Sequence, residues 1–135
     1  MDNVLKNFLI YSSLLVFFVN CKTTQISNDI TSELTQFETY NVEKLLKIAI
    51  EKGDPFLNKA KEIIIKRQEQ QIAQKILENN LIKYAHSWNI NYIKNSIILY
   101  KDIATSINLN LINTLAFSPS THVRQLSWVL AAYFP

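Results

Sequence analysis

The chain of 135 residues contains one glycine, one cysteine and three prolines. A β-rich domain of this size needs many turns with positive φ, and glycine usually supplies them. The single glycine, Gly53, therefore favours helices joined by short polar connections. The single cysteine, Cys21, excludes an internal disulfide bond. Because 48% of the residues are apolar and 19% are charged, the composition is typical of a globular chain rather than a disordered one.

The chain also has no block of five or more like charges, although its net charge is +3. Basic surfaces that bind nucleic acid are usually clustered. The densest charged stretch, residues 59–71, includes Glu62 and Glu69 among its lysines and its arginine. We interpret this stretch as the solvated face of a helix and expect no nucleic-acid partner.

Few residues are suited to catalysis or metal binding. The two histidines, His86 and His122, lie far apart in the sequence, whereas a metal site needs two or more ligands at close spacing. We interpret His86 as a cation at a helix C-terminus near Trp88, and His122 as a solvent-facing residue in the first turn of the last helix. There is no glycine-rich phosphate loop and no Ser-His-Asp arrangement with supporting glycines. We therefore expect no enzyme activity, no metal and no cofactor.

An uncharged and largely apolar run lies near the start of the chain, from Phe8 to Val19, where only Tyr11, Ser12 and Ser13 are at all polar. Twelve residues of helix cover about 18 Å, whereas a membrane-spanning helix needs about 20 residues to cross a hydrocarbon layer of ~30 Å. Lys6 and the amino terminus supply positive charge before the run. A basic segment followed by 7–15 apolar residues is typical of a secretory signal, so residues 1–20 are predicted to be a signal peptide.

The residues that follow this run, Phe18-Val19-Asn20-Cys21, resemble the lipobox of bacterial lipoprotein precursors. Asn20 and Phe18 depart from the small residue and the leucine that the family usually has there. The resemblance implies that Cys21 receives a diacylglycerol and that the chain is cut before it. Two or three acyl chains exceed the threshold for stable membrane anchoring. Residues 21–40, which are largely polar, would then be a lipid-anchored tether, and the protein would lie in the bacterial envelope, on the periplasmic face or at the cell surface.

Residues 41–135 are predicted to form an all-helical domain of about three helical hairpins. Asn41 is a plausible N-cap, and the apolar residues after it recur with helical spacing. Gly53 is expected to end this helix, and Asp54-Pro55 to start the next, with Asp54 as its N-cap and Pro55 at its first position. The three hairpins are expected near 41–66, 77–104 and 107–134. One alternative is a single long helix from Pro55 to about His86.

An internal comparison supports the repeated hairpins. Seven predicted core positions of the first hairpin are Leu45, Leu46, Ala49, Leu57, Ala60, Ile63 and Ile64. A shift of 36 residues places them on Leu81, Ile82, Ala85, Ile93, Ser96, Leu99 and Tyr100. A shift of 66 residues places them on Leu111, Ile112, Leu115, Val123, Leu126, Val129 and Leu130. Thirteen of the fourteen shifted positions are apolar, which indicates that each hairpin presents an apolar stripe to the next.

The stretch from Pro119 to Ala132, PSTHVRQLSWVLAA, resembles the second helix of a HEAT repeat. The matching features are the proline-containing turn, Val123-Arg124, the small Ser127 and Leu130. The resemblance implies that Val123 packs in a core, that Ser127 permits close helix packing, and that Arg124 bonds to an acidic residue of a neighbouring repeat. Ser118 replaces the usual aspartate and is expected to cap. The fold is thus predicted to be a short HEAT-like solenoid or, alternatively, another small helical bundle.

The last predicted helix is apolar on nearly all sides. A solenoid normally ends in a repeat with a polar outer face. We therefore predict that Trp128, Tyr133, Phe134 and Arg124 bind a protein partner or a second copy, since aromatic and arginine side chains often dominate such interfaces. One alternative is that Trp128 and Tyr133 fold back on the preceding helix; another is that a further repeat is missing. The predicted function is a membrane-anchored, non-catalytic helical binding or scaffold module. The alternative function is a structural envelope lipoprotein or a truncated remnant without binding activity.

Overall fold

The computed structural model describes residues 29–134, and this part of the chain contains helices and no strand. The chain divides into two compact units, Met1–Gln36 and Phe37–Pro135. In the first unit the described residues are helical, and this helical segment ends at residue 37. The segment 21–40, predicted to be a polar tether, therefore contains helix. The predicted signal peptide, residues 1–20, lies outside the described residues.

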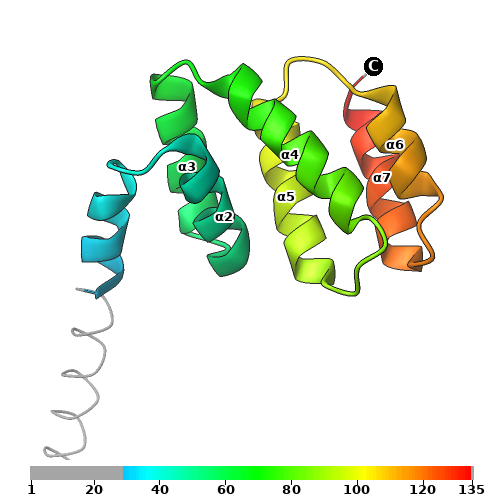
Figure 1. Cartoon of the computed structure of the whole chain (residues 1–135), viewed down its shortest axis with the longest axis horizontal. Coiled ribbons are helices and arrows are strands. Elements are labelled where there is room, and N and C mark those ends of the chain that lie inside the picture. The colour runs from blue at the N-terminus through cyan, green and yellow to red at the C-terminus, as the bar shows by residue number, and fades with distance from the viewer. Residues whose placement is uncertain (1–28, 135) are drawn as a thin grey trace, which may run out of the picture. The chain divides into compact units, whose positions relative to one another are not determined.

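The described part of the second unit contains six helices: α2 (Val42–Lys52), α3 (Phe56–Lys66), α4 (Gln70–Tyr84), α5 (Ile90–Ile103), α6 (Leu109–Ala116) and α7 (Thr121–Tyr133). Consecutive helices pair as the hairpins α2–α3, α4–α5 and α6–α7. In addition, α4 contacts α2 and α6, and α5 contacts α3 and α7. The hairpins thus stack in chain order, with α2, α4 and α6 in one layer and α3, α5 and α7 in the other (Figure 1). This confirms the predicted all-helical fold.

The first hairpin forms for the local reasons that the sequence indicates. The Asn41 side chain accepts a hydrogen bond from the backbone N–H of Lys44 at 2.9 Å, which caps α2. Gly53 ends the helix with a φ of 74°, a left-handed conformation that favours glycine. The prediction that Asp54 caps α3 is wrong. Pro55 occupies the position before the helix, and Asp54 instead accepts a hydrogen bond from Asn58 at 3.0 Å.

The alternative of one long helix from Pro55 to His86 is also wrong. The chain reverses between α3 and α4, where Gln68 has a φ of 58°. The Arg67 guanidinium donates to the backbone carbonyls of Tyr40 and Glu38, which ties this reversal to the segment before α2. A straight helix would carry the apolar positions of α4 away from the hairpin core. The second hairpin therefore begins at Gln70 rather than near residue 77, and Asn79 and Asn80 lie inside α4.

The core follows the internal repeat. All seven of the chosen positions of the first hairpin are buried. Ser96, the one polar residue among the shifted positions, is also fully buried, and its hydroxyl donates to the carbonyl of Tyr92 at 2.8 Å. In the third hairpin Leu111, Leu115, Val123 and Leu130 are buried. Val129 differs from its counterparts because it is exposed, and this difference leads to the candidate site.

Candidate docking surface

Helix α7 has one buried side and one exposed apolar side. Val123, Ser127 and Leu130 are buried, with the i, i+4, i+7 spacing of a single helix face. The exposed side carries Trp128, Val129 and Tyr133, with exposed fractions of 73%, 57% and 52%. The α7 face, as these three residues are called below, consists of large side chains that are each more than half exposed.

Val129 occupies a repeat position that the earlier hairpins bury. Its counterparts Ile63 in α3 and Leu99 in α5 are 5% and 1% exposed, whereas Val129 is 57% exposed. The difference has a simple geometric origin, because α5 packs on α3 and α7 packs on α5. Helix α7 is the last helix that the structure describes (Figure 1). The sequence comparison placed Val129 among the core positions and did not identify it as a site residue.

The three aromatic residues that were predicted to bind a partner differ in exposure and packing. Trp128 points into solvent and does not fold back on the preceding helix. Tyr133 lies below the Lys101 ammonium, whose Nζ is 5.0 Å from the ring centroid. Phe134 is half-buried and packs edge-on against Tyr100, with ring centroids 6.2 Å apart. Phe134 also contacts Tyr133, at 5.4 Å between centroids. Trp128 and Tyr133 are therefore the predicted residues that offer exposed surface.

Arg124 stabilises the turn of its own hairpin. Its guanidinium donates to the backbone carbonyls of Ser118 and Pro119 at 2.8 and 2.9 Å, and to the Thr121 hydroxyl at 3.0 Å. The bond to an acidic residue of a neighbouring repeat, which the HEAT resemblance implied, is not among these contacts. Ser118 was expected to cap α7, but the N-cap residue is Ser120; the Ser118 hydroxyl accepts a hydrogen bond from the backbone N–H of Ser120 at 3.2 Å. Ser118 is buried, and its hydroxyl donates to the carbonyl of Ala85 at 2.6 Å.

A partly buried polar cluster fixes the third hairpin to the second. Glu78 on α4 accepts hydrogen bonds from Gln74 and Tyr100 at one carboxylate oxygen and from Asn108 at the other, each at 2.9 Å. The same Asn108 caps α6, because its side-chain oxygen accepts from the backbone N–H groups of Asn110 and Leu111. The Glu78 cluster therefore links the start of α6 to α4 and α5. Sequence reasoning missed it, since its members are ordinary polar residues far apart in the chain.

The hydrogen bonds in the Glu78 cluster favour the ionised carboxylate. Burial alone would raise the pKa of Glu78, but the bonds from Gln74, Asn108 and Tyr100 outweigh burial and lower this pKa below its ordinary value. Burial and the bond to Glu78 raise the pKa of the Tyr100 hydroxyl. The cluster thus pairs an ionised acceptor with neutral donors. We assign it a structural role, because each donor is satisfied within the protein.

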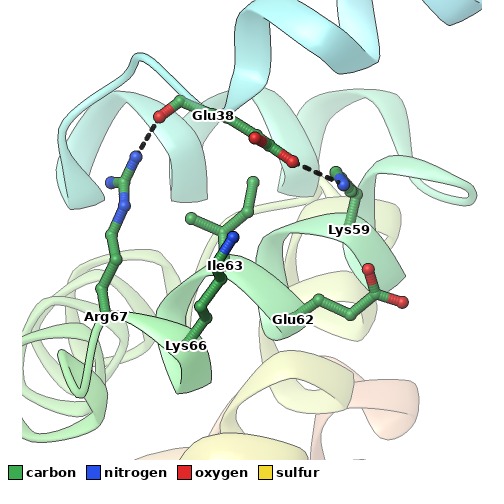
Figure 2. A pocket seen from close by; sticks show the side chains of 6 residues that line it. All are labelled: Glu38, Lys59, Glu62, Ile63, Lys66 and Arg67. Atoms are coloured by element: carbon green, nitrogen blue, oxygen red, sulfur yellow. Dashed lines mark hydrogen bonds and ion pairs between the residues drawn. The ribbon is translucent and has the colours of Figure 1, made fainter.

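A shallow pocket of about 390 Å³ lies beside α3 and is lined by Glu38, Lys59, Glu62, Ile63, Lys66 and Arg67 (Figure 2). Glu38 lies between two cations: its carboxylate is 2.9 Å from the Lys59 ammonium, and its backbone carbonyl accepts from Arg67. The hydrogen bond from Lys59 lowers the pKa of the Glu38 carboxyl. Since Lys59 and Arg67 both bond to Glu38 at this pocket, we interpret it as a depression between surface ion pairs.

Cys21 lies outside the described residues. None of the helices within residues 29–134 combines the length and the apolar character needed to cross a membrane. In the same part of the chain, no three His, Cys, Asp or Glu side chains converge as metal ligands would. His86 lies in the turn after α4, which ends at Tyr84, and His122 is exposed in the first turn of α7.

Comparisons with family models, with curated proteins and with solved structures find no match to this chain. The interpretation of its function therefore depends on its own residues.

Proposed function

We propose that this protein is a lipid-anchored, non-catalytic module of the bacterial cell envelope that binds a helical protein surface through the α7 face. The observation that carries the proposal is the exposure of Val129. A valine at a position that two earlier hairpins bury is the residue that a further helix would cover. Burial of exposed apolar surface stabilises a complex by roughly 25 cal/mol per Å² before the costs of association are subtracted.

The chemistry of the surface defines the partner. After Asp102 the only charged residue at neutral pH is Arg124, and its guanidinium is engaged in its own turn. The three side chains of the α7 face carry no charge, although the Lys101 ammonium lies over the Tyr133 ring. A charged partner surface would therefore gain no ion pair with the face residues themselves. The partner should instead present an uncharged apolar helix stripe, as α5 presents to α7. Trp128 is the natural anchor at the centre of such an interface, since tryptophan is enriched among binding hot spots.

The membrane attachment in this proposal rests on the sequence around Cys21. The short apolar core from Phe8 to Val19, the following cysteine and the polar residues after it support lipid modification at that position. A lipid anchor would hold the α7 face close to a bilayer and so confine the search for a partner to the envelope.

Site-specific photo-crosslinking in the native membrane tests the proposal. A photoreactive amino acid replaces Gln125, which is exposed one turn before Val129, so that Trp128 and Val129 stay intact. We expect one discrete covalent adduct on illumination. The control carries the same amino acid at Lys47, an exposed position on α2, and should give no discrete adduct. The mass of the adduct tells whether the partner is a second copy or another protein.

A second variant separates docking from folding. Removing α7 would expose the core, because Val123 and Leu130 are fully buried. Val129→Lys instead changes only a side chain on the exposed side. In the Gln125 crosslinking chain we expect this change to abolish the adduct while the helical circular dichroism spectrum is retained. The docking proposal is wrong if Gln125 gives no adduct, or if the adduct persists unchanged in the Val129→Lys chain.

A further inference from the structure

The two most exposed large apolar side chains of the described protein lie in two neighbouring turns. Trp88, in the α4–α5 turn, is 89% exposed, and Phe117, at the start of the α6–α7 turn, is 83% exposed. The two turns lie at the same end of the stacked hairpins (Figure 1). The hydrogen bond from Ser118 to the carbonyl of Ala85 joins them directly. We call residues 85–89 and 117–120 the paired turns.

Hydrogen bonds within the paired turns hold their backbone in place. In the first turn, the N–H of Asn89 donates to the Ser87 hydroxyl and the N–H of Ile90 donates to the carbonyl of Trp88. In the second, the N–H of Phe117 donates to Asn113, and Arg124 bonds to the carbonyls of Ser118 and Pro119. The two aromatic side chains are thus presented to solvent by ordered turns. The Phe117 side chain has no polar group, so no hydrogen bond offsets the exposure of its ring to water.

The paired turns themselves carry no acidic residue, although the Glu51 carboxylate of α2 lies within electrostatic range of Tyr92, in the first turn of α5. No acidic residue occurs between Glu78 and Asp102 or after Asp102. Those two acids are engaged elsewhere, Glu78 in its cluster and Asp102 with Lys61 at 3.1 Å. Lys83, in the last turn of α4, is exposed, and Arg124 lies at the second turn. The turn of the first hairpin differs, because it carries Asp54 and its nearby Phe56 is buried.

We propose that the paired turns contact the surface of an anionic lipid bilayer, with Trp88 and Phe117 inserted at the level of the headgroups. Tryptophan is enriched at membrane–water interfaces, where its apolar ring and its N–H are both accommodated. A basic residue near an anionic leaflet contributes about 1 kcal/mol, about fivefold in the binding constant. Two exposed aromatic side chains among basic residues, with no acidic residue in the turns, match this surface.

This contact goes beyond the proposed docking function, because no residue of the α7 face takes part in it. The paired turns lie at the opposite ends of helices α4 to α7 from the Glu78 cluster. It also gives the anchored protein a defined orientation. A single lipid attachment at Cys21 would not by itself fix the orientation of the domain above the membrane. A second contact at the paired turns would fix one end of the hairpins on the bilayer and leave Trp128 and Val129 available for a protein partner.

The two tryptophans make the proposal testable, because each reports on one surface. The full chain is prepared as Trp128→Phe, which retains only Trp88, and as Trp88→Phe, which retains only Trp128. Each is mixed with vesicles of phosphatidylcholine and phosphatidylglycerol, with and without brominated acyl chains. We expect Trp88 emission to move to shorter wavelength and to be quenched by the brominated lipid, and Trp128 to show neither effect. High salt or pure phosphatidylcholine should reduce the quenching of Trp88.

A matched pair of substitutions tests the role of Phe117. Phe117→Ser should weaken the quenching of Trp88, whereas Leu109→Ser, at a similarly exposed residue at the other end of α6, should not. The proposal is overturned if Trp88 stays unquenched, if Trp128 is quenched instead, or if the two serine variants act alike. Because the vesicles are supplied directly, the same measurement on Cys21→Ser chains does not depend on lipidation. If Trp88 stays unquenched but the Gln125 adduct forms, the bilayer contact is refuted and the docking proposal stands.

Discussion

Replacing Glu78 tests whether the polar cluster fixes the third hairpin to the second. Glu78→Ala removes the carboxylate that accepts hydrogen bonds from three donors, the side chains of Gln74, Tyr100 and Asn108. Hydrogen bonds to a charged group contribute about 1.5–3 kcal/mol each, and a buried donor left without a partner costs about 1–3 kcal/mol. The free-energy contributions of these three hydrogen bonds are not additive, because the bonds belong to one network. Gln74 also retains a bond to the Ser106 carbonyl at 3.1 Å.

We therefore expect Glu78→Ala to lower the free energy of unfolding by about 3 kcal/mol in total. With a urea m-value of about 1.5 kcal/mol per M, this lowers the midpoint of urea unfolding by about 2 M. Circular dichroism at neutral pH measures the change. The control Glu62→Ala removes an exposed carboxylate from α3 and should change the unfolding free energy by less than about 0.5 kcal/mol.

The pH dependence gives a sharper test of the same cluster. The pKa of Glu78 is lower in the folded chain than in the unfolded chain, so the unfolded chain binds more protons in the acid range. The contribution of the ionised carboxylate is therefore fully present above the unfolded pKa of about 4.3. It is lost as the pH falls through the lower folded pKa. Glu78→Gln keeps the shape but cannot ionise, and its deficit relative to the natural chain should shrink below about pH 4. A deficit that is independent of pH, or an alanine variant as stable as the natural chain, would refute this account of the cluster.

Further predictions concern the two sides of α7, the first turn and the lipid anchor. Leu130→Ala should lower the free energy of unfolding by about 2–5 kcal/mol, because Leu130 is fully buried. Val129→Ala, on the exposed side, should lower it by less than about 0.5 kcal/mol. Equal effects in urea unfolding would contradict the assignment of the two sides. Gly53→Ala should destabilise the chain by about 1–3 kcal/mol, because Gly53 has a φ of 74° and a ψ of −156°, a conformation essentially restricted to glycine. The nearest atom to a new Cβ, Asn95 Nδ2, is 3.6 Å away and leaves room for it, so the cost comes from the backbone. Unchanged thermal unfolding would mean that this turn relaxes freely. In the native membrane, intact mass spectrometry should show a chain that begins at Cys21 and carries acyl groups, and Cys21→Ser should abolish both changes; an unmodified full-length mass for the natural chain would exclude lipidation.

The sequence predicted the all-helical fold and the pairing of helices in three hairpins, but it placed the start of the second hairpin near residue 77 rather than at Gln70 and predicted a polar tether where residues 29–37 are helical. The spacing of apolar residues, the cap at Asn41 and the glycine at position 53 are local features, and each acts within one or two helical turns. The repeat comparison also predicted most of the core, because a stack of similar hairpins buries equivalent positions. The single cysteine after a short apolar run led to the lipid-anchor hypothesis, and that hypothesis still depends on the sequence.

The tertiary structure decided what depends on contacts between distant residues. The reversal at Gln68 is stabilised by Arg67 bonding to carbonyls before α2, about thirty positions away in the chain. The Glu78 cluster joins side chains from three segments, and none of these side chains is distinctive in the sequence. The exposure of Val129 and the joining of the paired turns are also tertiary facts. Composition and periodicity describe which residues favour burial, but only the packing of one hairpin on the next determines which of them a neighbour covers.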